Sequence, residues 1–135
     1  MFTYEIVSPE SLASRGKAKM IVLSAAEGRL GLLENHAPIV STLDPGIVSI
    51  YSDANTINAE LFVSGGFVSM IDNMCSILVD EVLTLTELTH DYVENRFKRA
   101  EDAVLLAQTA HDKVQARKQC KISQVMRALR STHQI

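Results

Sequence analysis

The feature that most constrains the fold of this sequence is a change of pattern near residue 88. Before it, short apolar runs recur at roughly 8–12-residue intervals between turn signals, which is typical of an all-β sandwich or barrel. From residue 89 to residue 135 the chain contains neither Gly nor Pro, and apolar residues recur at three- and four-residue steps, as on one face of a helix. We therefore expect an N-terminal antiparallel β-sandwich over residues 1–87 and a C-terminal antiparallel two-helix hairpin over residues 88–135.

Three glycine-containing stretches are expected to form turns of the sandwich. Gly16 precedes the strand expected at residues 17–23. Gly28 and Gly31 allow a close backbone reversal, because a residue without Cβ reaches positive φ at low cost. Asp44-Pro45-Gly46 predicts a turn in which Pro45 fixes φ and Gly46 takes the left-handed position.

The two helices are expected to meet at a short break at residues 110–112. Thr89 or Asp91 is suited to cap the first helix and Asp112 the second, because their side-chain oxygens accept a hydrogen bond from a free backbone N–H. The apolar stripes are Val93, Phe97, Ala100, Val104, Leu105 and Ala107, then Val114, Ile122, Val125, Met126 and Leu129. The free energy gained by burying so few side chains roughly cancels the cost of ordering them, so we expect the hairpin to be mobile unless it docks.

Composition argues against several classes of protein. The chain has no Trp and only 5% aromatic residues, which argues against a base-stacking nucleic-acid surface. Cys75 and Cys120 lie far apart and are expected to be reduced thiols of a cytosolic protein. The N-terminus does not resemble a signal peptide, and no stretch approaches the ~20 apolar residues of a membrane span. Any link to a membrane is therefore expected to come through a partner.

Charge is unevenly distributed along the chain. Residues 1–110 hold 7 Lys/Arg and 15 Asp/Glu, whereas residues 111–135 hold 6 Lys/Arg and 1 Asp. The net charges of the two parts are therefore −8 and +5. The basic residues of the second part are Lys113, Arg117, Lys118, Lys121, Arg127 and Arg130. They form either a solvated helix face or a surface that attracts an acidic partner.

The sequence offers no recognisable set of residues for catalysis, metal binding or cofactor binding. His36, His90, His111 and His133 lack metal-site spacing and have no Cys partner nearby. Ser64-Gly65-Gly66 has neither the pattern of a phosphate-binding loop nor that of a nucleophile elbow. We therefore expect a protein that is not an enzyme on its own and that binds no metal and no cofactor.

Four short motifs occur in a fixed order: EGRLG at residues 27–31, ENHAP at 34–38, DPG at 44–46 and SGG at 64–66. In order and spacing they resemble the epsilon subunits of F-type rotary ATP synthases of the bacterial type. That family has a β-sandwich followed by a helical hairpin, so the resemblance extends over the whole chain. It implies a non-catalytic central-stalk subunit that couples gamma to the c-ring of the proton-translocating complex, on the cytoplasmic face of the bacterial inner membrane.

The resemblance also implies where the partners bind. The turn at residues 27–31 and the shoulder at residues 34–38 are expected at the end of the sandwich that faces the gamma subunit and the polar loops of the c-ring. Glu27, Arg29, Glu34 and His36 are the candidate contacts. Asn35 stands where relatives have Gly, so we expect it to adopt the left-handed conformation, which Asn tolerates best after Gly.

For the hairpin, the resemblance implies regulation of ATP hydrolysis. The basic second helix is expected to meet an acidic segment of the catalytic beta subunit and to hinder hydrolysis. Some relatives bind ATP through an I/L-D-x-x-R-A motif, of which only Asp91 matches here, because Glu94 replaces the cation; we expect weak or absent ATP binding. The alternative from another class is a free-standing β-sandwich ligand-binding module with a helical dimerisation hairpin.

Overall fold

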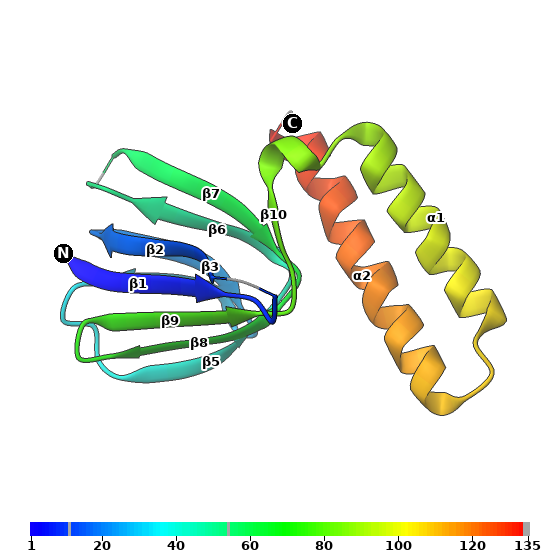
Figure 1. Cartoon of the computed structure of the whole chain (residues 1–135), viewed down its shortest axis with the longest axis horizontal. Helices are drawn as coiled ribbons and strands as arrows, with labels where there is room; N and C mark the ends of the chain where they lie inside the picture. Colours follow the sequence, from blue (N-terminus) through cyan, green and yellow to red (C-terminus); the bar gives the residue numbers. More distant parts are fainter. Residues whose placement is uncertain (11, 54, 134–135) are drawn as a thin grey trace. The chain divides into compact units, whose positions relative to one another are not determined.

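The computed structural model describes residues 1–10, 12–53 and 55–133. By its internal contacts the chain divides into two compact units, Met1–Thr84 and Leu85–Ile135 (Figure 1). Within the described residues, the first unit contains the β-strands and the second contains the two α-helices. The change of pattern near residue 88 therefore predicts the two classes of secondary structure correctly.

Ten strands lie in the described part of the first unit. They are β1 (Phe2–Val7), β2 (Leu12–Ala18), β3 (Met20–Ala25), β4 (Gly28–Leu33), β5 (Ile39–Leu43), β6 (Gly46–Tyr51), β7 (Ile57–Val63), β8 (Gly66–Ile71), β9 (Met74–Val79) and β10 (Val82–Thr84). Their order in the sheet is β10-β7-β6-β3-β5-β8-β9-β1-β2, and β4 also pairs with β3.

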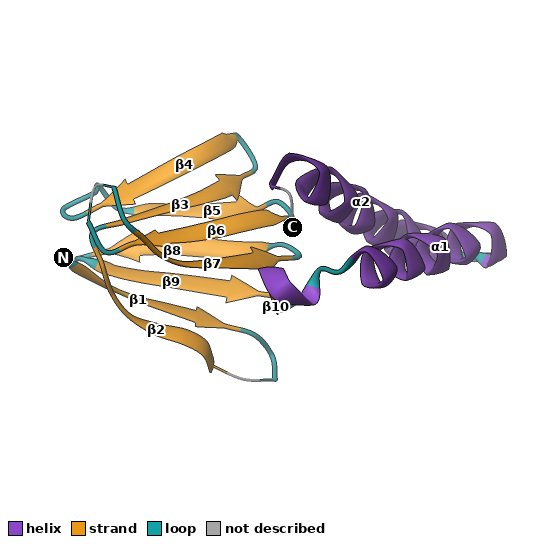
Figure 2. Cartoon of the chain, turned by 90° about the horizontal axis from the view of Figure 1, so that it is seen from above, coloured by secondary structure: helices purple, strands orange, loops and turns teal. Residues whose placement is uncertain are grey.

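The strands form two layers that meet along one corner. Strands β10, β7, β6, β3 and β4 are neighbours in one layer, and β5, β8, β9, β1 and β2 are neighbours in the other. Figure 2 shows the strands from above, where the two layers overlap. The layers are joined where Ala25 at the end of β3 pairs with Leu43 at the end of β5. The neighbours pair antiparallel except β1 and β9, which run parallel with Thr3 opposite Met74. The expected sandwich fold is thus confirmed, with one parallel pair that the sequence pattern did not predict.

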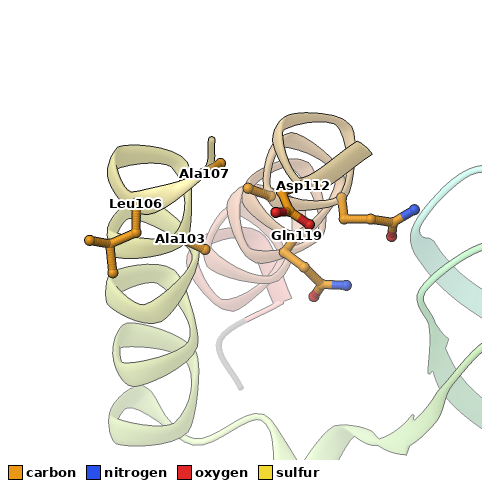
Figure 3. A pocket seen from close by; sticks show the side chains of 7 residues that line it. Ala103, Leu106, Ala107, Asp112 and Gln119 are labelled. Atoms are coloured by element: carbon orange, nitrogen blue, oxygen red, sulfur yellow. The ribbon is translucent and has the colours of Figure 1, made fainter. Parts of the chain in front are cut away.

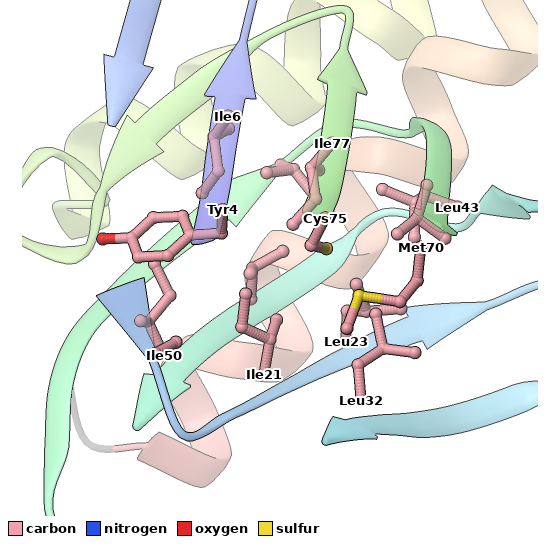
Figure 4. Close-up of a cluster of buried hydrophobic side chains, with 14 of the residues drawn as sticks. Tyr4, Ile6, Ile21, Leu23, Leu32, Leu43, Ile50, Met70, Cys75 and Ile77 are labelled. Carbon is pink, nitrogen blue, oxygen red and sulfur yellow. The ribbon is translucent and has the colours of Figure 1, made fainter. Parts of the chain in front are cut away.

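Alternating residues of the strands fill the space between the layers. Along β1, for example, Phe2, Tyr4 and Ile6 are buried while the residues between them are half-buried. Figure 4 shows Tyr4, Ile6, Ile21, Leu23, Leu32, Leu43, Ile50, Met70, Cys75 and Ile77 in this core. Each large apolar side chain removed from water contributes about 1.5–3 kcal/mol. This core fixes the register of the strands, because a slip of one residue would turn every buried side chain outward.

The turn expected at Gly28 is confirmed, since β3 and β4 pair antiparallel across it and Gly28 has φ 124°, but the roles expected of Gly16, Gly31 and Gly46 are wrong. Gly16 lies within β2 and Gly31 within β4, and Gly46 opens β6 without the left-handed conformation. At two of these positions the missing Cβ serves close packing instead: a Cβ on Gly16 would lie 3.3 Å from the Tyr4 hydroxyl, and one on Gly46 would lie 3.0 Å from Ser24 Oγ. The strand expected at residues 17–23 is in fact divided between β2 and β3.

The second unit consists of a short 3₁₀ turn, η1 (Leu85–Glu87), and the helices α1 (His90–Leu106) and α2 (Ala110–His133). Thr89 caps α1, since its hydroxyl accepts a hydrogen bond from the Tyr92 N–H. The cap expected at Asp112 is wrong: Thr109 accepts from the Asp112 N–H at 3.0 Å, so Asp112 lies inside the first turn of α2. The carboxylate still complements the helix dipole there.

The apolar stripes of the hairpin are buried only along part of their length. Val93 on α1 and Met126 on α2 are fully buried, as the helical period predicts. Val104, Leu105 and Val114 were expected in the same stripes but are 40%, 83% and 59% exposed. These three lie near the connection between the helices, where Ala103 and Ala107 on the side of the first helix and Ala116 on the side of the second line an open groove. Small side chains leave little apolar surface for the larger ones to pack against.

Candidate functional site

Two of the predicted contact residues lie where β3 turns into β4: Glu27 in the turn and Arg29 at the start of β4. Both are exposed, and Gly28 between them adopts φ 124°, which a residue with a Cβ rarely reaches. Arg29 Nη1 donates to Ser24 Oγ at 3.0 Å and to the Ile47 carbonyl at 3.1 Å. The Arg29 guanidinium is therefore tied to the neighbouring strands β3 and β6, and Glu27 is presented at the turn itself.

The shoulder between β4 and β5 carries the other two, Glu34 and His36. Asn35 between them has φ 64°, so the left-handed conformation predicted for it is confirmed. The Asn35 N–H donates to Asn73 Oδ1 at 2.6 Å, and Asn73 Nδ2 donates to Asn35 Oδ1 at 3.1 Å. His36 Nδ1 lies 2.7 Å from the Ala37 carbonyl oxygen. The shoulder is thus held against the β8–β9 turn, which contains Asn73.

The four predicted contact residues do not come together in space. Strand β4 separates Glu27 and Arg29 from Glu34 and His36, and a six-residue strand is about 20 Å long. The residues expected at one end of the sandwich therefore lie at two ends. The structure brings Glu27 near Arg29 and Glu34 near His36, and these pairs cannot share a single small contact.

One outer face of the sandwich is apolar, and sequence reasoning missed it. We define the outer apolar face as the exposed side chains of β5, β8 and β9: Val40, Phe67, Ile71, Met74 and Leu78. Phe67 pairs directly with Leu78, and Ile71 with Met74. Val40 is 71% and Phe67 57% exposed. Their strand neighbours Val68, Met70, Cys75 and Ile77 fill the core, so apolar residues cover both sides of this layer.

A contiguous exposed apolar surface of this kind more often marks a protein–protein interface than a surface that stays in contact with solvent. The signal was present in the sequence, since β8 and β9 carry apolar residues on both the odd and the even positions. A strand buried on both sides gives the same pattern. Sequence alone therefore could not distinguish an inner strand from an outer strand that waits for a partner.

The hairpin contains an ion pair between its two helices. Arg127 Nε and Nη2 donate to the two carboxylate oxygens of Glu94 at 3.1 and 2.6 Å. The same guanidinium lies 3.8 Å from the centroid of the Phe97 ring. The hydrogen bonds between the two side chains lower the pKa of Glu94 and raise the pKa of Arg127. Arg130 donates in addition to the Leu88 carbonyl.

These contacts change the interpretation of the six basic residues, all of which lie on α2: Lys113, Arg117, Lys118, Lys121, Arg127 and Arg130. Lys113, Arg117, Lys118 and Lys121 are exposed. Arg127 and Arg130 are bound within the hairpin. The hairpin as folded here therefore does not present all six cations together to a partner.

A further link joins the helices through Arg96, which sequence reasoning did not consider. Its Nη1 donates to the Tyr92 hydroxyl at 3.1 Å, and its Nη2 donates to Gln119 Oε1 on α2 at 3.0 Å. Asp91, the only match to the nucleotide-binding motif, is exposed in the first turn of α1. Glu94 stands at the position of the motif's cation, and its carboxylate forms an ion pair with Arg127.

Near the connection between the helices lies an open groove of about 370 Å³ (Figure 3). Its lining comes from the end of α1 and the start of α2: Ala103, Leu106, Ala107, Asp112, Gln115, Ala116 and Gln119. Leu106 is 77% exposed beside it. The hairpin is thus fastened by polar links at the start of α1 and is loosely packed at its turn.

In residues 1–10, 12–53 and 55–133, no group of three or more His, Cys, Asp or Glu side chains is arranged to hold a metal ion. Within the same ranges, none of the helices combines the length and the apolar character needed to cross a bilayer. The features that stand out in the described residues are therefore surfaces: two polar ends, one apolar face and one hairpin.

Comparison with known proteins gives a consistent result. Residues 1–84 match the family model of the ATP synthase Delta/Epsilon chain β-sandwich domain. The ATP synthase epsilon chain of Paramagnetospirillum magneticum is 34% identical over 125 residues, which cover 93% of both chains. The epsilon chain of Rhodospirillum rubrum is 32% identical, with 94% of both chains covered. These relatives therefore align with the hairpin as well as with the sandwich.

Solved structures share the fold at lower identity. A chain in the Euglena gracilis mitochondrial ATP synthase, described as OSCP/F1/c-ring in rotational state 1, matches with a TM-score of 0.75 and 20% identity, covering 93% of this chain and 78% of that one. A chain in the central stalk/c-ring structure of the Tetrahymena thermophila mitochondrial ATP synthase matches with a TM-score of 0.69 and 19% identity, covering 93% of both.

Proposed function

Because this chain belongs to the family of ATP synthase epsilon chains, we propose that it is a non-catalytic subunit of the central stalk of a bacterial-type, proton-translocating ATP synthase. The observation that carries the proposal is the identity of 34% over 93% of both chains, which includes both structural units. The alternative of a free-standing ligand-binding module is set aside for the same reason. Through the complex, the chain resides on the cytoplasmic face of the inner membrane.

The sandwich, in this proposal, couples the gamma subunit to the c-ring. The outer apolar face packs against gamma, since its exposed Phe67 and Leu78 would be removed from water there. The two polar ends make separate contacts, because β4 holds Glu27 and Arg29 apart from Glu34 and His36. One end meets the polar loops of the c-ring and the other adds to the gamma contact.

Cross-linking from single introduced cysteines tests which subunit each polar end of the sandwich contacts. Cysteines placed at Glu27 and at His36, in the assembled complex, should cross-link to different subunits, one to the c-ring and one to gamma. Cross-linking of both positions to the same subunit would contradict the assignment of separate contacts. Cross-linking of neither position to gamma or the c-ring would contradict the coupling role.

The hairpin, in this proposal, regulates ATP hydrolysis. Its second helix carries the cations that would meet an acidic segment of the catalytic beta subunit. Arg127 and Arg130 reach such a segment only when their contacts are released, that of Arg127 with Glu94 on α1 and that of Arg130 with the Leu88 carbonyl before α1. Inhibition that uses all six cations therefore requires a change in the hairpin. The sandwich alone lacks these cations and should bind without inhibiting.

The test is ATP hydrolysis by a catalytic head depleted of its epsilon subunit, with the chain added back. Full-length protein should lower the hydrolysis rate, and protein cut after Glu87 should bind without lowering it. Binding is measured separately by co-purification with gamma. If the full-length and truncated proteins inhibit equally, regulation does not reside in the hairpin. If neither binds, the stalk role fails.

A further inference from the structure

The contact between Glu94 and Arg127 is better formed than an ordinary surface ion pair. It is bidentate, with both carboxylate oxygens accepting from the guanidinium, at 3.1 and 2.6 Å. Two parallel hydrogen bonds fix the orientation of an Arg–carboxylate pair as well as its distance. The same guanidinium lies over the Phe97 ring, with its carbon 3.8 Å from the ring centroid. Two side chains of α1 thus converge on one cation of α2.

The position of this cluster determines which end of the hairpin it holds together. Arg127 lies in the last third of α2, and Glu94 and Phe97 lie in the first half of α1. At the other end, near the helix connection, residues of both helices line an open groove of about 370 Å³. The links that Arg127 makes with Glu94 and Phe97 therefore lie at the end of the hairpin opposite the covalent connection. Separation of the two helices would otherwise begin at that end.

We propose that Glu94, Arg127 and Phe97 form a latch that holds α2 against α1 and withholds Arg127 from an acidic protein partner. The Glu94 carboxylate occupies the guanidinium fork that an acidic side chain of a partner would use. Opening the hairpin and exposing Arg127 are then a single event. The proposal deepens the regulatory part of the proposed function and rests on it for the identity of the partner as an acidic surface.

A latch of modest strength is sufficient for such a switch. The Glu94 side chain is 39% and that of Arg127 48% exposed, so water and salt weaken their attraction. Loss of a pair of this kind changes an equilibrium by about two- to fivefold. That change matters only if the closed and open forms are close in free energy, as the few large buried side chains of the hairpin indicate.

The experiment measures amide hydrogen exchange of the full chain by mass spectrometry at low salt. Glu94→Gln keeps the shape of the side chain and removes its charge, and Arg127→Gln removes the other partner. Amides of α2 should exchange about two- to fivefold faster in either variant. The double variant should exchange no faster than the faster single variant. Added salt at 1 M should reduce the difference between wild type and Glu94→Gln.

Two control variants separate the latch from a general effect of charge. Asp102→Asn removes an exposed charge from the same helix, and Glu5→Gln removes the ion pair between Glu5 and Arg15 in the sandwich. Neither should change exchange in α2. Amides of the core strand β8 serve as an internal reference, because equal protection there shows that each variant is folded.

The latch is overturned if Glu94→Gln alters α2 exchange no more than Asp102→Asn does, or if the effects of the two single variants simply add. This result is independent of inhibition in the complex. If the latch fails while full-length protein still inhibits hydrolysis, the proposed function stands without it. If the latch is confirmed while no inhibition occurs, the regulatory role fails and the latch remains a property of the hairpin.

Discussion

Asn35 and Asn73, 38 positions apart in the chain, bind each other reciprocally: the Asn35 N–H donates to Asn73 Oδ1, and Asn73 Nδ2 donates to Asn35 Oδ1. Both have positive φ, 64° and 62°. Two residues in a conformation that costs most side chains energy thus stabilise each other. This pair connects the polar shoulder to the β8–β9 turn at one end of the sandwich.

Replacing Asn35 should destabilise the sandwich in proportion to what is lost. Asn35→Ala loses the acceptor for Asn73 Nδ2 and strains the backbone, so the free energy of unfolding should fall by about 1–3 kcal/mol. Asn35→Gly loses only the acceptor and should cost clearly less. Urea unfolding of both variants measures the difference. Equal losses would show that the left-handed backbone contributes nothing.

Substitution by alanine should strongly destabilise the fold at Gly66 but have little effect on stability at Gly31. A Cβ on Gly66 would lie 1.9 Å from the Leu78 carbonyl oxygen, and φ there is 147°. Gly66→Ala should therefore lower the unfolding free energy by about 3 kcal/mol or more, enough to impair folding. A Cβ on Gly31 meets nothing within 4 Å, so Gly31→Ala should leave stability within about 1 kcal/mol of wild type. Thermal unfolding followed by circular dichroism measures the stability of both variants. Comparable losses of stability at the two sites would contradict the register of β8 and β9.

Cys75 should make the stability of the sandwich depend on pH in the alkaline range. Burial raises the pKa of its thiol from the ordinary 9.0 to about 12. The folded state keeps the thiol neutral while the unfolded chain ionises, so the unfolding free energy falls as the pH rises above 9. The loss attributable to Cys75 is about 1 kcal/mol between pH 9 and pH 10.

The measurement is urea unfolding under reducing conditions at pH 8, 9 and 10. Cys75→Ala should lack this part of the pH dependence, although it is less stable throughout because of the cavity. Cys120→Ala, at a half-buried position, serves as the control and should retain the slope of wild type. Parallel pH profiles for wild type and Cys75→Ala would show that the thiol ionises as easily in the fold as in the unfolded chain.

The outer apolar face should be needed for partner binding but not for folding. Phe67→Ser removes a side chain that is 57% exposed, so the sandwich should unfold at nearly the same urea concentration. Affinity for gamma should fall about tenfold or more if Phe67 is a central contact. Ile57→Ser on β7, 45% exposed and outside this face, is the matched control and should bind normally. Equal affinity of both variants would exclude the face as the gamma contact.

The sequence predicts the secondary structure well because periods of about two and 3.6 residues follow directly from strand and helix geometry. Glycine was a poorer guide. Gly16 and Gly46 were expected in turns, yet they serve the close approach of Tyr4 and Ser24, and such contacts come from residues far apart in the chain. A glycine signals either use, and only the packed structure distinguishes them.

The candidate site shows the same limit. Asn35 was predicted correctly because its conformation is a local property. From the sequence, Glu94 was interpreted only as a replacement for the cation of the nucleotide-binding motif, whereas it binds Arg127, 33 residues later. That contact depends on how α1 and α2 are aligned, and the helical period fixes the face of each helix but not their relative register.

The parallel pairing of β1 with β9 has a consequence for how the chain is made. Thr3 meets its partner Met74 only after every strand from β2 to β8 has been synthesised. Before then β1 can pair only with β2, the other neighbour it has in the finished sheet. Contacts so distant in sequence slow folding, and a strand that lacks its neighbour is an open edge at which chains associate. Strand β1 is thus made before β2–β9 but gains its second neighbour only when β9 arrives, and nascent chains are most prone to aggregate while β9 is still being made.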